Sequence, residues 1–270
     1  MVAPSIITRS FRSPSIDPET IATQDSGDSR IARHIDAFLA RQPHHALSKN
    51  GAEKLASLLR DERAVEDRET LSHRGETLTQ AVLLLEGFAF RTIKRDEQRA
   101  IVGISVPGDF LDLHGFLLGR IDHDVVAAGA GRVACIDHDQ FNSLLDESPD
   151  LARVLWRSSL LDAAVHRSWI QTLEKHDAPR RIAHIFCELQ ARLEMTGRAN
   201  PHAVRTPFTQ FDLADMCGVS AVHANRAVGK LREMELADIR RGTFYPGDWE
   251  AIRNYARFDP DYLFAVSRTN

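Results

Sequence analysis

The sequence predicts an α+β protein in which a small β-barrel is followed by a long helix and then by a compact helical unit. Three observations predict this order. Residues 70–137 hold short apolar runs separated by Gly- and Asp-bearing turns, which is typical of a β-sandwich or barrel. From residue 149 the apolar spacing becomes helical over some 25 residues. Shorter helical patterns follow Pro179, and 270 residues are enough for two domains.

The composition is that of a globular protein, with 43% hydrophobic residues. No run of about 18 uncharged apolar residues occurs, so we expect no membrane partner. Residues 1–9 lack the apolar core of a signal peptide. The three cysteines, Cys135, Cys187 and Cys217, are too far apart for a zinc motif or a disulfide framework. We therefore expect a cytoplasmic protein.

Composition and period divide the chain into five predicted segments. Residues 1–29 are rich in Ser, Thr, Pro and Asp and are predicted to be a disordered tail. The others are a sensory barrel over 30–148, a dimerisation helix over 149–176, a winged helix-turn-helix domain over 177–253 and a C-terminal tail over 254–270. The proline-containing break from His176 to Pro179 marks the boundary between the long helix and the last domain.

The long helix has an apolar stripe that we interpret as a dimer seam. Pro149 suits the first turn of a helix. The predicted seam residues are Leu151, Leu155, Val165 and Trp169. A long helix leaving a small barrel favours a homodimer. The alternative is a helix that packs only on its own barrel.

Residues 209–220 carry the features of a helix followed by a tight turn. Thr209 and Asp212 have the spacing of a capping box. Gly218 can adopt the positive φ that a tight turn between helices requires. Ser220 can cap a second helix. Together they predict a helix-turn-helix.

The second helix is predicted to be amphipathic and to enter the major groove of DNA. Its buried face should hold Ala224, Ala227, Val228 and Leu231. Between Ser220 and Arg232 there is no acidic residue. The predicted DNA-contacting residues of this helix are Ser220, Ala221, Val222, His223, Asn225, Arg226 and Lys230. An ordinary αα-hairpin, or a protein-interaction module, is the alternative.

A short hairpin is expected directly after this helix. Residues 237–240 and 243–246 flank Arg241-Gly242 and form the expected wing. Arg240 and Arg241 would lie near backbone phosphates.

This order of elements resembles the CRP/FNR family of regulators over about residues 70–262. The residues that carry the resemblance are Pro107-Gly108-Asp109-Phe110, Arg181-Ile182-Ala183, Asp212-Leu213-Ala214 to Gly218, Arg226, and Phe258 to Leu263. The resemblance implies a double-stranded β-helix (jelly-roll) barrel like the cyclic-nucleotide-binding fold. It also implies a homodimer, double-stranded DNA as partner and RNA polymerase as a further partner.

The barrel lacks the residues that bind cyclic AMP in members of this family. Those members supply a Gly-Glu pair and then an Arg-Ser pair, whereas the corresponding stretches here are Leu111 to Gly115 and Ile121 to Asp124. Asp122 and Asp124 would repel a phosphate. Arg120 is one position away and leaves a cyclic-nucleotide-responsive regulator as the alternative. We expect no cofactor, and the effector is left open.

Other chemistries have less support in the sequence. Iron–sulfur members of the family carry N-terminal cysteines, and no cysteine precedes Cys135. Two Asp-His-Asp triplets, at residues 122–124 and 137–139, contain ligand types that metals accept. Adjacent strand residues point to opposite faces, so we interpret both as polar turns and expect no metal site. A cupin-like enzyme, a further alternative, needs a His-x-His pair that is missing. Whether Cys217 responds to oxidation is left open.

Overall fold

The computed structural model describes residues 27–40, 47–96 and 98–264. The predicted disordered tail lies outside these residues, apart from residues 27–29, which begin α1 (Gly27–Ala40). None of the helices described is both long and apolar enough to cross a bilayer.

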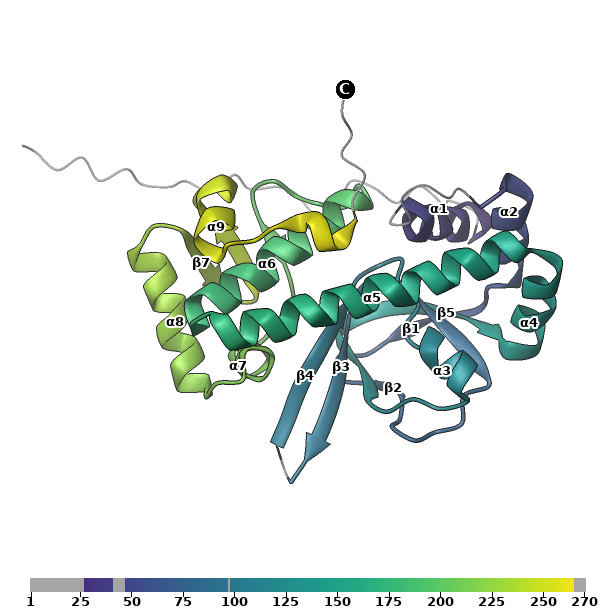
Figure 1. Ribbon diagram of the computed structural model, residues 1–270, viewed down its shortest axis with the longest axis horizontal. Coiled ribbons are helices and arrows are strands. Elements are labelled where there is room, and N and C mark those ends of the chain that lie inside the picture. The colour runs from purple at the N-terminus through teal and green to yellow at the C-terminus, as the bar shows by residue number, and fades with distance from the viewer. Residues whose placement is uncertain (1–26, 41–46, 97, 265–270) are drawn as a thin grey trace, which may run out of the picture.

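An antiparallel sheet of five strands forms the barrel, as predicted. The strands are β1 (Arg60–Val65), β2 (Thr70–Ser72), β3 (Gln80–Arg95), β4 (Gln98–Ser105) and β5 (Asp124–Asp137). Their order is β1-β5-β3-β4, and β2 also pairs with β5. The helix α3 (Leu113–Leu118) lies between β4 and β5 in the chain. The long β3–β4 hairpin projects from the barrel (Figure 1).

Three helices close one end of the barrel, α1, α2 (Lys49–Leu58) and α4 (His138–Glu147). Phe110 joins them to the sheet, because its ring lies 5.2 Å from that of Phe38 and 5.8 Å from that of Phe141. Gly108, two residues earlier, has φ +95° and packs against the backbone of α1. The Pro107 to Phe110 turn therefore fixes α1 to the barrel.

The helix α5 (Pro149–Lys175) is 27 residues long and connects the barrel to the C-terminal domain (Figure 1). The structure corrects the predicted seam. Leu151, Leu155 and Trp169 are buried inside the same chain, and Val165 packs against the same core as Trp169. The large apolar side chains of α5 that reach solvent are Trp156, Leu160, Ile170 and Leu173.

The C-terminal domain begins with α6 (Ala178–Met195). It continues through β6 (Val204–Arg205), α7 (Gln210–Cys217), α8 (Ala221–Glu233), β7 (Ala237–Arg240), β8 (Thr243–Pro246), α9 (Trp249–Ala256) and η1 (Pro260–Leu263). The predicted tail from residue 254 is wrong up to Phe264, because α9 crosses that boundary. Phe258 and Leu263 are buried, and the Tyr262 hydroxyl donates to Glu188 at 2.8 Å.

The barrel and the C-terminal domain share one hydrophobic cluster. The ring of Phe208, which precedes α7, lies 5.4 Å from Phe88 and 5.1 Å from Phe90 on β3. Gly129 on β5 has φ +79°, and a Cβ there would meet Pro207 at 2.6 Å. One hydrophobic core therefore contains residues from both sides of the predicted domain boundary at residue 177.

Candidate nucleic-acid interface and its connection to the barrel

The first helix of the predicted helix-turn-helix is capped as its sequence indicated. The Thr209 hydroxyl accepts from the backbone N–H of Asp212 at 3.2 Å, and the Asp212 carboxylate accepts from the backbone N–H of Thr209 at 2.8 Å. Gly218 ends α7 with φ 62° in the left-handed region. The turn between α7 and α8 therefore has the predicted geometry.

The helix α8 is amphipathic in the predicted register. The Ser220 hydroxyl accepts from the His223 backbone N–H at 3.2 Å and caps its first turn. The predicted inner face, Ala224, Ala227, Val228 and Leu231, is buried. The outer face exposes Ser220, Val222, His223, Asn225, Arg226 and Lys230, whereas Ala221 is half-buried. The surface of α8 is thus open to a partner.

The basic residues on the surface of α8 differ in whether they have an ion-pair partner. Arg226 makes no hydrogen bond or ion pair with the described part of the chain. Lys230 lies 3.8 Å from Asp177, at the start of α6. Asn225 accepts from the Gln210 side chain of α7 at 3.1 Å. Gln210 was missed in the sequence, although its place beside the Thr209 cap puts it at the exposed start of α7.

The predicted wing is present as the β7–β8 hairpin. Arg240 pairs with Thr243 across it, and Arg241 and Gly242 turn the chain with φ 48° and 77°. A Cβ on Gly242 would clash with the carbonyl of Thr206, which explains the glycine. Arg240 is held by Asp238, whereas Arg241 is exposed and forms no ion pair with the described residues.

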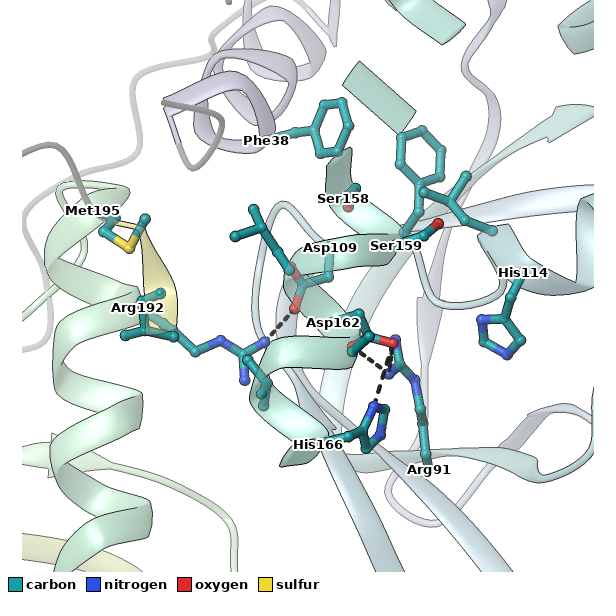
Figure 2. A pocket seen from close by; sticks show the side chains of 16 residues that line it. Phe38, Arg91, Asp109, His114, Ser158, Ser159, Asp162, His166, Arg192 and Met195 are labelled. Atoms are coloured by element: carbon teal, nitrogen blue, oxygen red, sulfur yellow. Dashed lines mark hydrogen bonds and ion pairs between the residues drawn. The ribbon is translucent and has the colours of Figure 1, made fainter. Parts of the chain in front are cut away.

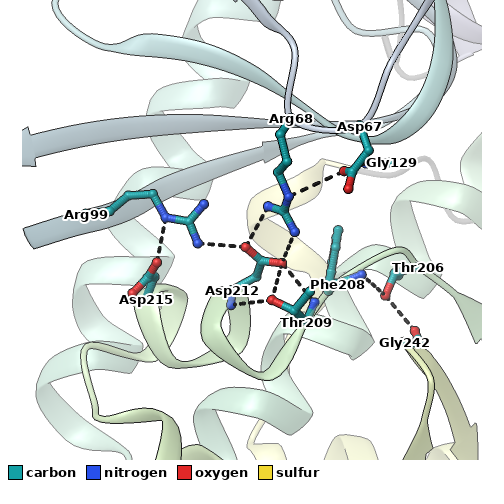
Figure 3. A network of polar contacts seen from close by, with 10 residues as sticks. All are labelled: Asp67, Arg68, Arg99, Gly129, Thr206, Phe208, Thr209, Asp212, Asp215 and Gly242. Carbon is teal, nitrogen blue, oxygen red and sulfur yellow. Dashed lines mark hydrogen bonds and ion pairs between the residues drawn. The ribbon is translucent and has the colours of Figure 1, made fainter.

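Asp212 also connects the helix-turn-helix to the barrel (Figure 3). Its two carboxylate oxygens accept from the guanidinium of Arg68 at 2.8 and 2.6 Å, and one of them accepts from Arg99 on β4 at 2.7 Å. Arg99 also donates to Asp215 at 2.6 Å. Burial alone would raise the pKa of Asp212, but the hydrogen bonds from Arg68, Thr209 and Arg99 outweigh it and lower the pKa to about 2.

One guanidinium spans the boundary between α5 and α6 and also reaches α7. Arg181 donates to the backbone carbonyls of Leu173, His176 and Cys217 at 2.7, 2.7 and 2.6 Å. Two of these carbonyls belong to the end of α5 and one to the end of α7. Because the last carbonyls of a helix lack partners within it, Arg181 satisfies and joins both helix ends.

A cavity of about 170 Å³ lies between the barrel, α5 and α6 (Figure 2). Arg91 on β3 enters it and donates to both carboxylate oxygens of Asp162 at 2.6 Å. Arg192 on α6 donates to Asp109 at 2.7 Å, which ties the Pro107 to Phe110 turn to α6. His114 on α3 also lines the cavity.

A buried carboxyl lies in the stretch Leu111 to Gly115, which corresponds to the Gly-Glu turn of cyclic-AMP-binding members. Asp112 is the N-cap of α3, is fully buried, and accepts from the Val82 backbone N–H at 3.0 Å. Burial raises the pKa of Asp112 to about 7. Arg120, the displaced candidate for a phosphate ligand, is exposed.

All three cysteines behave as core or half-buried thiols. Burial raises the pKa of Cys217 and of Cys187 to about 12, and that of Cys135 to about 11. Because the thiolate is the reactive form, none of them has the environment of a reactive cysteine.

Two known domain families match separate segments of the chain. The cyclic nucleotide-binding domain family matches residues 62–148, and the Crp-like helix-turn-helix domain family matches residues 180–255. Together with the geometry of α7, α8 and the wing, these matches define a transcription regulator with a helix-turn-helix DNA-binding domain and a cyclic-nucleotide-binding-like domain.

Curated relatives agree with this class. The transcriptional activator protein FnrL of Cereibacter sphaeroides is 24% identical over 187 residues, which cover 67% of this chain and 75% of FnrL. The nitrogen fixation regulation protein FixK of Bradyrhizobium diazoefficiens is 26% identical over 164 residues, or 60% of this chain and 68% of FixK. The chain belongs to the CRP/FNR family of transcription regulators.

Solved structures share the fold at low sequence identity. FixK2 from Bradyrhizobium japonicum superposes with a TM-score of 0.64 at 16% identity, covering 72% of this chain and 96% of FixK2. The c-di-GMP-responsive global regulator CLP of Xanthomonas campestris gives 0.57 at 17% identity, covering 73% and 98%. The barrel, long helix and helix-turn-helix therefore occur in the same arrangement in other regulators.

Proposed function

We propose that two copies of this chain bind an inverted-repeat operator in double-stranded DNA, with one α8 in each of two successive major grooves. The observation that carries the proposal is the outer face of α8, where exposed Arg226 has no partner among the described residues. An unpaired guanidinium on a helix surface suits the O6 and N7 acceptors of a guanine. RNA polymerase is the further partner that we propose, and the cytoplasm is the location.

The neighbours of Arg226 indicate how the operator is read. Asn225 can form two hydrogen bonds with an adenine once it leaves Gln210. Val222 is 64% exposed and apolar, so it can contact only the methyl group of a thymine. We propose that His223, Lys230 and Arg241, which are exposed, contact phosphates and so fix the position of the protein without reading the base sequence.

The second copy is proposed to pack against the exposed side of α5. Trp156 and Leu160 are 70% and 57% exposed and lie one helical turn apart, and Ile170 is 65% exposed further along. The opposite side of α5 is already occupied by the barrel and by α6. A second α5 of the same kind would bury these side chains, as in a two-helix seam.

We propose that neither cyclic AMP nor cyclic GMP controls the barrel. Asp122 supplies negative charge beside α3, and Arg120 is turned to solvent. An anionic phosphate placed there would lack the charge-assisted hydrogen bonds that bind it in a cyclic-nucleotide site.

No enzymatic activity is proposed, and neither a cupin-like reaction nor a protein-only role for the helix-turn-helix has a specific observation in its favour.

Selection of bound DNA from a random library tests this proposal. Wild-type protein should enrich an inverted repeat whose half-sites are about 10 bp apart, centre to centre. Arg226→Ala should enrich a sequence that is degenerate at one base pair of each half-site. Enrichment of a single half-site, or none, would overturn the proposed mode of binding.

Calorimetry with cyclic AMP and cyclic GMP tests the proposal that neither nucleotide controls the barrel, and micromolar binding of either would contradict it.

A further inference from the structure

Three ligand-bearing side chains meet at the side of the barrel, away from α8. His114 comes from α3, and Asp122 and His123 come from the turn before β5. One nitrogen or oxygen atom of each lies within 4.8 Å of the other two. Within residues 27–40, 47–96 and 98–264, no other three His, Cys, Asp or Glu side chains come together in this way.

The two imidazoles of this cluster each have a nitrogen without a partner. His123 is 5% exposed. Its Nε2 and that of His114 are buried, and neither forms a hydrogen bond with the residues described. The ring centroids lie 5.0 Å apart. A buried polar atom left unpaired costs about 1–3 kcal/mol, so a ligand that engages both nitrogens would remove a cost that the fold carries.

We propose that His114, Asp122 and His123 bind a divalent first-row transition-metal ion of the zinc class. Two imidazoles and one carboxylate form a typical donor set for such ions and leave a coordination position open. Asp122 Oδ1 lies 2.8 Å from His123 Nδ1, so on metal binding the carboxylate would turn from that nitrogen to the ion, while His123 would bind through its unpartnered Nε2.

The cluster has to contract slightly around the ion, and the outer side of α3 offers little resistance to such a shift. Bonds of about 2.1 Å in a tetrahedron place the ligand atoms about 3.4 Å apart, less than the 4.8 Å limit found here. Leu117 and Leu118 on the outer side of α3 are 80% and 74% exposed. A small shift of α3 therefore disturbs little packing on that side.

Charged groups of both signs surround the two rings: Arg91 disfavours positive charge there, and the carboxylates of Asp162 and Asp122 act against it. Arg91 is the nearby guanidinium that acts on both rings, and Asp162 accepts from it at 2.6 Å with both carboxylate oxygens. Asp122 adds a second carboxylate. Because Asp162 is already paired with Arg91, the Asp122 carboxylate supplies the negative charge that a cation in the cluster would meet.

Titration of the full-length, untagged protein with Co²⁺ and then Zn²⁺ tests the site. Wild type should bind one equivalent of Co²⁺ with the visible absorption of a histidine-ligated ion, and Zn²⁺ should abolish this absorption. His114→Gln and His123→Ala should each lose that equivalent, and Asp122→Asn should weaken binding, because an amide oxygen is a weaker ligand than a carboxylate. Circular dichroism of each variant shows whether the fold is retained.

His138 offers a matched control. It lies in the second Asp-His-Asp triplet, and its Nε2 is also buried without a partner, but among the described residues it belongs to no group of three ligand-bearing side chains. His138→Ala should bind Co²⁺ as wild type does. An absent wild-type spectrum would overturn the proposal. So would a spectrum that persists unchanged in a folded His114→Gln or His123→Ala variant.

A sensory role for the metal rests on the proposed DNA-binding function. His114 also lines the cavity beside α5, so movement of α3 would reach the helix that joins the two domains (Figure 2). Zn²⁺ should change the operator affinity of wild type and leave that of His123→Ala unchanged. Equal affinity with and without Zn²⁺ in wild type would overturn the sensory role. Loss of operator binding under both conditions would instead overturn the proposed DNA-binding function.

Discussion

Arg68, in the turn between β1 and β2, forms a two-pronged ion pair with Asp212 on the first helix of the helix-turn-helix. The two residues lie 144 positions apart in the sequence, and their side chains meet at 2.6 and 2.8 Å. The same carboxylate caps α7. One side chain thus begins the DNA-binding motif and fixes it to the barrel.

Replacing Asp212 should therefore destabilise the protein in a pH-dependent way. The pKa of Asp212 is lowered from 3.8 to about 2, so its ionised form stabilises the folded state above about pH 4. That stabilisation is lost as the pH falls from about 4 to about 2. At neutral pH, Asp212→Asn should lower the free energy of unfolding by roughly 2–3 kcal/mol. Denaturant unfolding of both proteins across this range measures the difference, which should shrink with acid.

Asp215→Asn is the matched control for this prediction. Asp215 lies on the same helix and accepts from Arg99, but it is 26% exposed and does not cap α7. Its replacement should cost less than about 1 kcal/mol. An equal loss for both variants would show that the link to the barrel, and not the combined cap, carries the stability.

Much of the helix-turn-helix could be predicted because its determinants are local. The Thr209 to Asp212 spacing, the glycine turn and the Ser220 cap each act within one or two helical turns. The partners of Asp212 could not be predicted, because nothing in a sequence pattern indicates which distant arginines a folded chain will bring to a carboxylate.

The burial of Leu151, Leu155 and Trp169 within the chain could not be predicted for a related reason. Both sides of α5 carry apolar side chains. The spacing of these residues therefore predicts a helix, but it does not indicate which side of the helix packs on the barrel. The meeting of His114 with Asp122 and His123 was not predicted, because the triplet at residues 122–124 was considered as a strand alone, whereas the additional imidazole comes from α3.

The exposed side of α5 predicts which substitutions dissociate the dimer. Leu160→Asp should give a folded monomer, because the charge would lie unpaired in the seam of the dimer and in water in the monomer. Leu155→Asp should instead destabilise each chain by several kcal/mol, since Leu155 is 8% exposed within the monomer. Sedimentation at several concentrations, together with thermal unfolding, distinguishes the two. A Leu160→Asp dimer of unchanged affinity would place the seam elsewhere.

Arg181 should determine how firmly α6 and α7 are attached to α5. Arg181→Gln removes a charged donor from three carbonyls and should cost about 2 kcal/mol or more in the free energy of unfolding. Arg180→Gln is the neighbouring control, because Arg180 packs over the ring of Tyr255 and satisfies no helix end. Chemical unfolding followed by circular dichroism should show the larger loss for Arg181→Gln, and equal losses would contradict the prediction.

Base readout by α8 is tested most directly by fluorescence anisotropy on the selected operator and on its single-base variants. Arg226→Ala should cost about 1–3 kcal/mol of binding free energy and should remove the preference at one base pair. Lys230→Ala, four residues along the same helix, should weaken binding to every sequence alike and reduce the slope of affinity against salt by about 1. If Arg226→Ala lost affinity equally on all operator variants, Arg226 would only anchor a phosphate, and base readout by this arginine would be contradicted.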